Sequence, residues 1–366
     1  MATPTTTSIP SSTNSTSSPS CTTAVPDRYG YVPADACNAQ WAYSPSFTSA
    51  VAFSVVFGLA TLSHILLAIL HRKPFCWVII MGTVWELSAF ILRSLASHNQ
   101  QNSTYAIISQ ILFLLTPLWI NAFVYMTTGR LVYMLHPNKS IWKFKAVSMG
   151  KWFVWLDILS FLVQAAGGLM LSPEYEPNIT DIGKTIYMSG LALQQFFILL
   201  FLALIVRFHL DALNLDGQGL LCSQTGNGNK RWRYLTYTLY TVLVLITMRI
   251  IFRVVEFSGG MDPKVNQLPY KEGFALGLDA FPMALAVVLF ALVHPGLVLK
   301  GSESELPSRM EKKANKKAKR EAKKILRQAK NAGLAEGMHN SPINVRKSNE
   351  NLGSESMEME SARRTD

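Results

Sequence analysis

The sequence predicts an all-α integral membrane protein, a bundle of seven transmembrane helices. The chain has 366 residues, 49% of them hydrophobic, and a mean hydropathy of +0.20. Seven apolar stretches follow one another along it, each long enough to cross about 30 Å of hydrocarbon, which takes roughly 20 helical residues. Soluble chains of this length rarely contain such stretches, so composition and length agree on the class.

The seven stretches divide the chain into three parts. Residues 1–46 are predicted to be an extracellular N-terminal segment, whose Ser, Thr and Pro content cannot bury a core. Residues 47–300 form the predicted membrane domain, and residues 301–366 a basic, largely disordered cytosolic tail. The predicted helices are 47–70, 76–97, 105–134, 147–171, 184–208, 233–257 and 273–299.

The distribution of Lys and Arg predicts the orientation of the bundle. Basic residues gather in the connections "HRKP" after the first stretch, "HPNKSIWKFK" after the third and "GNGNKRWR" after the fifth, and in the tail. Other connections, such as "SHNQQNST" and "SPEYEPNITDIGK", are poor in them. Because cytosolic loops carry the excess of Lys and Arg, the N-terminus is predicted outside and the C-terminus in the cytosol.

Glycosylation sequons predict the same orientation. Asn14, Asn102 and Asn178 each begin an Asn-x-Ser/Thr motif and fall on the predicted outer side, where they are candidate glycosylation sites. A fourth sequon, at Asn138, falls on the inner side and is predicted to stay unmodified.

The cysteines and histidines do not form a metal-binding motif. Cys21 and Cys37 lie in the predicted outer segment, where thiols oxidise, so they form either a disulfide or two unpaired thiols. Cys76 and Cys222 are isolated, and no CxxC spacing points to zinc. The histidines lack ligand spacing, and His294, which precedes a proline, is predicted to mark a helix end. No cofactor is expected.

Charged and amide side chains recur inside the apolar stretches at helical spacing. In the sixth stretch Arg249, Arg253 and Glu256 are spaced i, i+4, i+7, so they share one helix face. Each charge near the middle of a membrane costs at least about 2.5–3.5 kcal/mol unless it finds a partner. Polar stripes on several helices are therefore typical of a bundle lined inside by polar groups. The candidate substrate-binding residues are Glu86, Arg93, Asp157, Gln164, Gln194, Arg249, Arg253, Glu256, Glu272 and Asp279.

Two interpretations of these stripes stay open. The three arginines could neutralise three of the acids in an ion-pair network that only locks the helices together, the candidate acids being Glu86, Asp157, Glu256 and Asp279. Alternatively, the same groups line a functional cavity. The cluster as a whole favours a cavity, because helices pack more simply through small residues. The position of the charges along each stretch places most of the cluster in the outer half of the bundle.

The positive net charge of +11 belongs mainly to the tail. Residues 309–330 hold 11 Lys or Arg against Glu311 and Glu321, which supplies +9 of the total. This stretch is helix-prone and its apolar positions are mostly alanine. We therefore expect salt-sensitive binding to anionic lipid of the inner leaflet, with a solvated charged helix as the alternative. A nucleic-acid partner is not expected.

The combined motifs of the membrane domain resemble those of the fungal RTA-like lipid-translocating exporter family. The resemblance covers about residues 29–300. It is carried by "WELSAFILR", "LTPLWINAFVYMTTGR", "DILSFLVQAAGG", "GKTIYMSGLALQQ", "RIIFRVVEFSGG" and "EGFALGLDAFPMALAVVLFALVHPG". It implies a plasma-membrane protein that exports amphipathic lipids, such as sphingoid bases, and gives resistance to sterol-like toxins. Some relatives are linked to porphyrin or haem handling.

Three functions are compatible with these observations. A translocator of sphingoid bases or sterol-like lipids would hold the lipid head group between helices two, four, six and seven, with membrane lipids as its partners. A seven-helix receptor for lipids or toxins fits the helix count equally, although the third stretch ends in "TGRLVYMLHP" and not in an acid-Arg-aromatic triplet. Porphyrin handling is the third. An enzyme is not expected, because GxSxG, Walker and HExxH motifs are absent.

Overall fold

The computed structural model contains seven helical spans that are long and apolar enough to cross a membrane, which confirms the predicted class. Six of them are continuous: α1 (Phe47–His71), α2 (Trp77–His98), α3 (Ser103–Leu135), α4 (Ala146–Leu169), α5 (Pro177–Gly217) and α7 (Arg231–Ser258). The structure describes residues 22–33, 36, 38–39, 41–137, 139–141, 144–171, 176–219, 231–259, 266–299, 306 and 309–331.

The seventh span is built from several elements. It runs through α8 (Glu272–Ala275), the π-helical turn η3 (Leu276–Ala280), α9 (Phe281–Leu292) and the 3₁₀ turn η4 (Pro295–Leu297). The remaining elements are η1 (Pro74–Cys76), η2 (Leu268–Tyr270), the strands β1 (Ser140–Ile141) and β2 (Phe144–Lys145), and the tail helix α10 (Arg309–Asn331). The chain divides into two compact units, residues 1–306 and 307–366.

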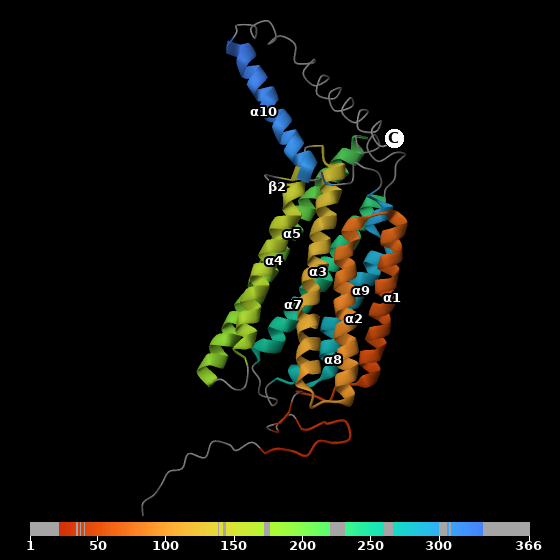
Figure 1. Ribbon diagram of the computed structural model, residues 1–366, viewed down its shortest axis with the longest axis vertical. Helices are drawn as coiled ribbons and strands as arrows, with labels where there is room; N and C mark the ends of the chain where they lie inside the picture. The colour runs from red at the N-terminus through yellow and green to blue at the C-terminus, as the bar shows by residue number, and fades with distance from the viewer. Residues whose placement is uncertain are drawn as a thin grey trace, which may run out of the picture. The chain divides into compact units, whose positions relative to one another are not determined.

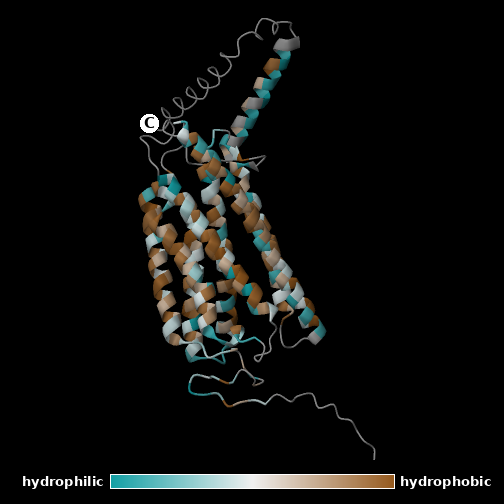
Figure 2. Ribbon diagram, turned by 180° about the vertical axis from the view of Figure 1, so that it is seen from behind, coloured by the Kyte–Doolittle hydropathy of each residue, from teal (hydrophilic) through white to brown (hydrophobic). Residues whose placement is uncertain are grey.

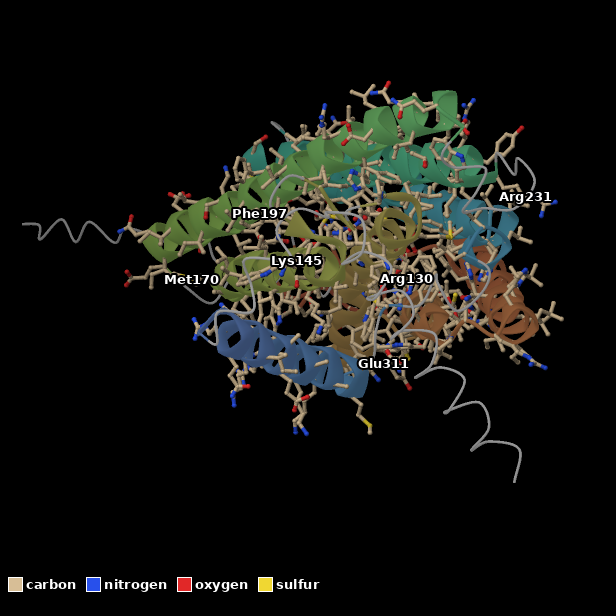
Figure 3. The ribbon with its side chains drawn as sticks, turned by 90° about the horizontal axis from the view of Figure 1, so that it is seen from above. Arg130, Lys145, Met170, Phe197, Arg231 and Glu311 are labelled. Carbon is tan, nitrogen blue, oxygen red and sulfur yellow. The ribbon has the colours of Figure 1, made fainter. Side chains whose placement is uncertain are left out.

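The helices of the first unit lie side by side in an up-and-down bundle (Figure 1). We call its two ends the α8 end and the hairpin end, after α8 and the antiparallel β1–β2 pair. Toward the α8 end, α4 and α5 diverge from α3 in Figure 1. The view along the bundle in Figure 3 agrees, because α4 and α5, marked by Met170 and Phe197, reach sideways from the other helices.

The sides of the bundle are apolar, as a lipid environment requires (Figure 2). Large hydrophobic side chains with more than half of their surface exposed occur on several helices, among them Leu59, Leu70, Trp155, Leu162 and Val244. In water such a surface would be unfavourable, whereas in a bilayer it contacts lipid tails. The chain is therefore an integral membrane protein.

Local sequence explains where the helices begin and end. The Asn102 side chain accepts from the backbone N–H groups of Thr104 and Tyr105 and so caps α3. At the other end of the seventh span, His294 and Pro295 follow α9, and the His294 imidazole accepts from the Gly296 N–H at 3.1 Å. The helix end predicted at His294 is thus confirmed.

Two predicted segments differ from the structure in extent. The prediction 184–208 covers only the middle of α5, because the helix continues at both ends into polar residues that composition excludes from a span. The prediction 273–299 treats the seventh span as one α-helix. Pro282, which has no N–H to donate, stands at the start of α9, directly after the π-helical turn that interrupts this helix.

The predicted modification sites are placed only in part. Asn102 and Asn178 stand at the starts of α3 and α5, at the same end of the bundle, and Asn178 is exposed. Asn14, Asn138, Cys21 and Cys37 lie outside the described residues. The orientation of the bundle and the three-part division of the chain stay predictions.

Candidate functional site

Two arginines of α7 share one carboxylate inside the bundle. Arg249 pairs through Nε with Asp279 Oδ1, and Arg253 pairs through Nη2 with Asp279 Oδ2 at 2.5 Å. Arg253 Nη1 also donates to Glu256 Oε2 at 3.0 Å. All four side chains are buried, and that of Asp279 completely. The spacing i, i+4, i+7 therefore brings together the residues that the sequence predicted on one face.

The π-helical turn η3 places Asp279 against the arginines. The Phe281 N–H donates to the Leu276 carbonyl, five residues earlier, which widens the helix by one residue at this point. The extra residue changes which side chains share a face. Glu272 and Asp279, seven apart, consequently belong to two different clusters instead of one stripe.

Glu272 belongs to a cluster at the α8 end. Its Oε1 accepts from Arg93 Nη2 at 3.0 Å, and its Oε2 accepts from the Ser46 N–H at 2.8 Å. Arg93 also donates to the Tyr43 hydroxyl and lies over the Trp41 and Tyr43 rings, each 5.5 Å from the ring centroid. This cluster ties the chain that precedes α1 to α2 and α8.

A lateral cavity opens beside the paired arginines. Its volume is about 410 Å³, and it lies between α3, α4, α5 and α7. The polar lining is Gln164, Tyr187, Gln194, Arg249 and Arg253, and the rest is apolar.

The lateral cavity reaches the lipid-facing side of the bundle. Two residues of its wall, Ile111 of α3 and Leu169 of α4, are 49% and 76% exposed on that side. The divergence of α4 and α5 from α3 in Figure 1 is the backbone feature that makes room for it.

A second cavity, the end cavity, adjoins the first along Ile111, Leu169 and Arg253, which line both. Its volume is about 510 Å³, and it lies between residues 41–43, α2, α3, α7 and the start of the seventh span. Arg93 and Glu256 line it together with Arg253. Because Arg253 lines both cavities, its ion pairs stand at the boundary between them.

The α4–α5 contact forms the far wall of the lateral cavity. Gln164 Nε2 donates to Gln194 Oε1 at 2.9 Å, across the two helices. The two helices approach closely because each has a glycine at the contact, Gly167 on α4 and Gly190 on α5. A Cβ at Gly167 would lie 2.4 Å from the Tyr187 nitrogen, and one at Gly190 would lie 2.7 Å from the Gln164 side chain. Gln164 and Gln194, two of the predicted cavity residues, are thus brought together by close contact between the α4 and α5 backbones.

Asp157 lies outside this site. Its Oδ2 accepts from Asn121 Nδ2 and from the Tyr125 hydroxyl, both at 2.9 Å, which joins α4 to α3. It lines neither the lateral nor the end cavity. Asp157 thus differs from the sequence prediction: its partners are neutral, and no ion pair within the described residues involves it.

Glu86 is buried near the cluster but is not paired with it. It is 1% exposed, and the group that interacts with it at hydrogen-bond range is the Thr116 side chain of α3, not an arginine. The charges of Arg249, Arg253 and Asp279 act on it from α7 and η3. Like Asp157, it lines neither of the two cavities. The three arginines therefore neutralise Asp279, Glu256 and Glu272, and not Glu86 or Asp157.

Sequence reasoning missed the aromatic part of the site. The centroid of the Phe113 ring of α3 lies 5.9 Å from the Arg249 guanidinium and 5.8 Å from that of Arg253. Both arginines therefore make a cation–π contact with the same ring. Trp41, Tyr43 and Tyr187 were missed as well. An aromatic residue in an apolar stretch carries no periodic signal of its own, so only the packing of the helices identifies these four.

Comparison with known proteins identifies related chains. The model of the RTA1-like protein family matches residues 79–302. "Probable lipid transporter atnI" of Emericella nidulans is 40% identical over 82% of this chain and 79% of its own. "Protoporphyrin uptake protein 1" of Saccharomyces cerevisiae is 30% identical over 58% and 65%, and "Sphingoid long-chain base transporter RSB1" of the same species is 23% identical over 72% and 75%. No solved structure matches the chain.

Proposed function

The chain belongs to the RTA1-like protein family, and from this premise we propose that it moves amphipathic lipids across a membrane. The polar head of the lipid would enter the lateral cavity and lie against Arg249, Arg253 and the Gln164–Gln194 pair. Its apolar part would lie along α3 and α4. The relatives named as lipid and sphingoid-base transporters support the same role, and a transporter needs no catalytic constellation.

One observation carries this proposal above the others. The lateral cavity combines an apolar side, which reaches the lipid-facing surface at Ile111 and Leu169, with charged groups at its inner end. A lipid has the same arrangement, with an apolar chain and a polar head. A cavity for a soluble ligand would not need a wall that faces lipid.

The end cavity supports movement and not only binding. A head group that leaves the lateral cavity meets Arg253 and Glu256, and beyond them lies the end cavity. The Arg253–Glu256 and Arg253–Asp279 pairs would then be the contacts that a passing head group exchanges. The head-group site expected between helices two, four, six and seven is accordingly refined to α4, α5, α7 and η3, with Arg93 on the route.

The proposal is tested by filling the lateral cavity. Ala165 lines it from α4, whereas the neighbouring Ala166 is exposed to lipid and does not line it. The full chain is reconstituted in vesicles that contain a lipid with a fluorescent chain, and the fraction accessible to an external quencher is followed over time. Ala165→Phe should slow lipid movement strongly, and Ala166→Phe should leave it unchanged.

One result would contradict lipid transport, and another would contradict the route. Vesicles with the unchanged protein that move lipid no faster than empty vesicles would contradict transport. If both phenylalanine variants move lipid as fast as the unchanged protein, the lateral cavity is not the route. Specific lipid binding without movement would favour the receptor-like alternative. Movement of a porphyrin in place of lipid would favour the activity that the name of the protoporphyrin relative describes.

The finer features of the sequence prediction belong to the same proposal. The substrates would be sphingoid bases or sterol-like compounds, the membrane the plasma membrane, and the α8 end would face outward. If so, Asn102→Gln and Asn178→Gln each remove a glycan in a glycosylating host, and Asn138→Gln removes none. Treatment with a glycosidase and a gel-mobility comparison measure this. A glycan at Asn138 would reverse the proposed orientation.

A further inference from the structure

We propose that the lateral cavity selects an anionic head group, a phosphate or a carboxylate carried by an amphipathic molecule. This inference rests on the proposed function, because it presupposes that the cavity holds a lipid. It narrows the substrate class through the charge of the groups that a head would touch. It also opposes the sphingoid bases expected as substrates from the sequence, because their head is an amine, so the two substrate classes are alternatives that the test below separates.

The charged residues that line the lateral cavity are both arginines. Arg249 and Arg253 stand in its wall, and no acidic side chain does so among the described residues. Asp279 is fully buried behind the arginines, and Glu256 lines the end cavity on the other side of Arg253. A head group in the lateral cavity therefore meets guanidinium groups first.

Arg249 keeps a donor that no described residue uses. Its side chain is 8% exposed and pairs through Nε with Asp279, whereas Nη2 is buried without a hydrogen-bond partner. A buried donor left without a partner is destabilising. An oxygen of a bound phosphate or carboxylate would satisfy it with a charge-assisted bond.

The two arginines are balanced in charge by two acids, but only the arginines stand in the wall of the lateral cavity. Asp279 pairs with both arginines. Glu256 pairs with Arg253 only. An anion in the lateral cavity would therefore contact the Arg249 guanidinium directly, whereas an ammonium group there would approach two guanidiniums with the acids behind them.

The neutral polar groups of the cavity do not reverse this preference. The bond between Gln164 and Gln194 uses the Gln164 amide nitrogen and the Gln194 carbonyl oxygen. The Gln164 carbonyl oxygen can still accept a hydrogen bond, and the Gln194 amide nitrogen can still donate one. The Tyr187 hydroxyl can donate or accept. Neutral amides and hydroxyls accommodate either sign, so the arginines decide the selectivity.

The test uses four probes with one and the same oleyl chain. Oleoyl lysophosphatidate and oleic acid carry anionic heads, oleylamine a cationic head, and oleyl alcohol a neutral one. Binding of each to the purified full chain in detergent is measured by competition against a fluorescent lipid. Inorganic phosphate alone is a fifth probe, because it separates a lipid-borne anion from a free one.

We expect both anionic amphiphiles to bind at least about tenfold more tightly than oleylamine, with the alcohol in between. The double variant Arg249→Gln, Asp279→Asn removes one charge of each sign and leaves no unpaired charge at either position, so it should fold and lose this preference. Arg207→Gln removes a half-exposed positive charge of α5 outside the cavity and should keep it. Inorganic phosphate should bind far more weakly than lysophosphatidate.

Each contrary result has a distinct meaning. Equal binding of all four amphiphiles, or tighter binding of oleylamine, would overturn the anionic preference and leave lipid binding intact. A preference that survives in the double variant would overturn the role of Arg249. If Ala165→Phe leaves all binding unchanged, the cavity is not the lipid site and the proposed function itself fails. Phosphate that binds as tightly as lysophosphatidate would replace the lipid by a soluble anion.

Discussion

The two ends of the bundle are packed by different means. At the hairpin end, Phe201 packs edge to face against Tyr125 and Phe153, which are tilted against each other, and the ring centroids lie 4.4–5.5 Å apart. At the α8 end, ion pairs, an amide pair and two cavities occupy the corresponding space. Close packing resists deformation, whereas polar pairs beside cavities can exchange partners. We infer from this difference that the half of the bundle at the hairpin end is rigid, and that the half at the α8 end can admit a ligand.

His64, His294 and Cys76 belong to the rigid half. His64 Nε2 donates to the Val287 carbonyl at 3.0 Å, and Cys76 Sγ lies 3.5 Å from His294 Nε2. These contacts join α1, α2 and the seventh span near the hairpin end. No group of three or more metal-ligating side chains in the described part of the chain is placed to hold a metal ion. Their contacts explain these residues as packing between helices.

The largest expected effect breaks the polar half directly. Arg253→Ala leaves Glu256 without its ion pair and Asp279 with only one of two, which should lower the free energy of unfolding by about 3–5 kcal/mol. The thermal midpoint of the detergent-solubilised protein, followed by gel filtration, measures this loss. Arg207→Gln, at a half-exposed pair, is the control and should cost less than about 1 kcal/mol.

The same residues distinguish scaffold from site. Removing both charges in Arg253→Ala, Asp279→Ala should cost less stability than Arg253→Ala alone, because the strongest buried pair disappears as a unit. Arg249 and Glu256 both lose their ion-pair partners there, so part of the loss remains. A double variant that recovers stability and also moves lipid at the normal rate would reduce the ion pairs to a scaffold.

A second expected effect concerns the close contact between α4 and α5, which forms the far wall of the lateral cavity. Gly167→Ala places a Cβ within 3 Å of the Tyr187 and Gly183 backbones, so α4 and α5 must separate. We expect a loss of about 1–3 kcal/mol and a changed rate of lipid movement, because the Gln164–Gln194 pair shifts. Gly168→Ala is a matched control on the next residue, where the nearest atom is 3.9 Å away. Equal thermal midpoints for both variants would show that this contact does not hold the wall.

The sequence predicts the bundle better than it predicts the site. Seven apolar stretches and the face shared by Arg249, Arg253 and Glu256 follow from length and periodicity alone, and both agree with the structure. The choice of partners does not. Asp157 and Glu86 have the spacing of cavity residues, but the rotation and tilt of neighbouring helices decide that neither lines a cavity. Sequence periodicity shows which residues share a face of one helix. It does not show how α3, α4, α5 and α7 turn their faces toward one cavity.

The seventh span illustrates the same limit within one helix. A spacing of seven places Glu272 and Asp279 on one face only if the helix is continuous. The π-helical turn before Pro282 adds a residue between them, and each acid then finds a different arginine. A proline in an apolar stretch warns of a break, but it does not state which kind of turn compensates for the missing bond.

A smaller effect is expected from the polar cluster that stands apart from the cavities. Asp157→Asn keeps an oxygen that can accept from Asn121 or Tyr125 and removes only the charge. We expect a change of about 1 kcal/mol in stability and unchanged lipid movement. The vesicle assay and the thermal midpoint measure both. Loss of transport in a protein of normal stability would extend the site to Asp157 and break the division of the bundle into two halves.

The smallest effect on transport is expected from the tail helix α10, which belongs to a separate compact unit. Residues 307–366 can be removed without touching either cavity, so lipid movement per folded molecule should stay within about twofold, a change below 0.5 kcal/mol.

We expect a peptide of residues 309–331 to bind phosphatidylserine vesicles and not to bind pure phosphatidylcholine vesicles. It should dissociate as salt is added, because its attraction is chiefly electrostatic. Its exposed Met310, Ile325 and Leu326 offer little apolar area for insertion. Replacing Lys316, Lys317, Lys323 and Lys324 by Gln should abolish binding, whereas replacing Ile325 and Leu326 by Ala should weaken it slightly. Equal binding to both kinds of vesicle would contradict an electrostatic anchor, and no binding to either would leave α10 a solvated helix.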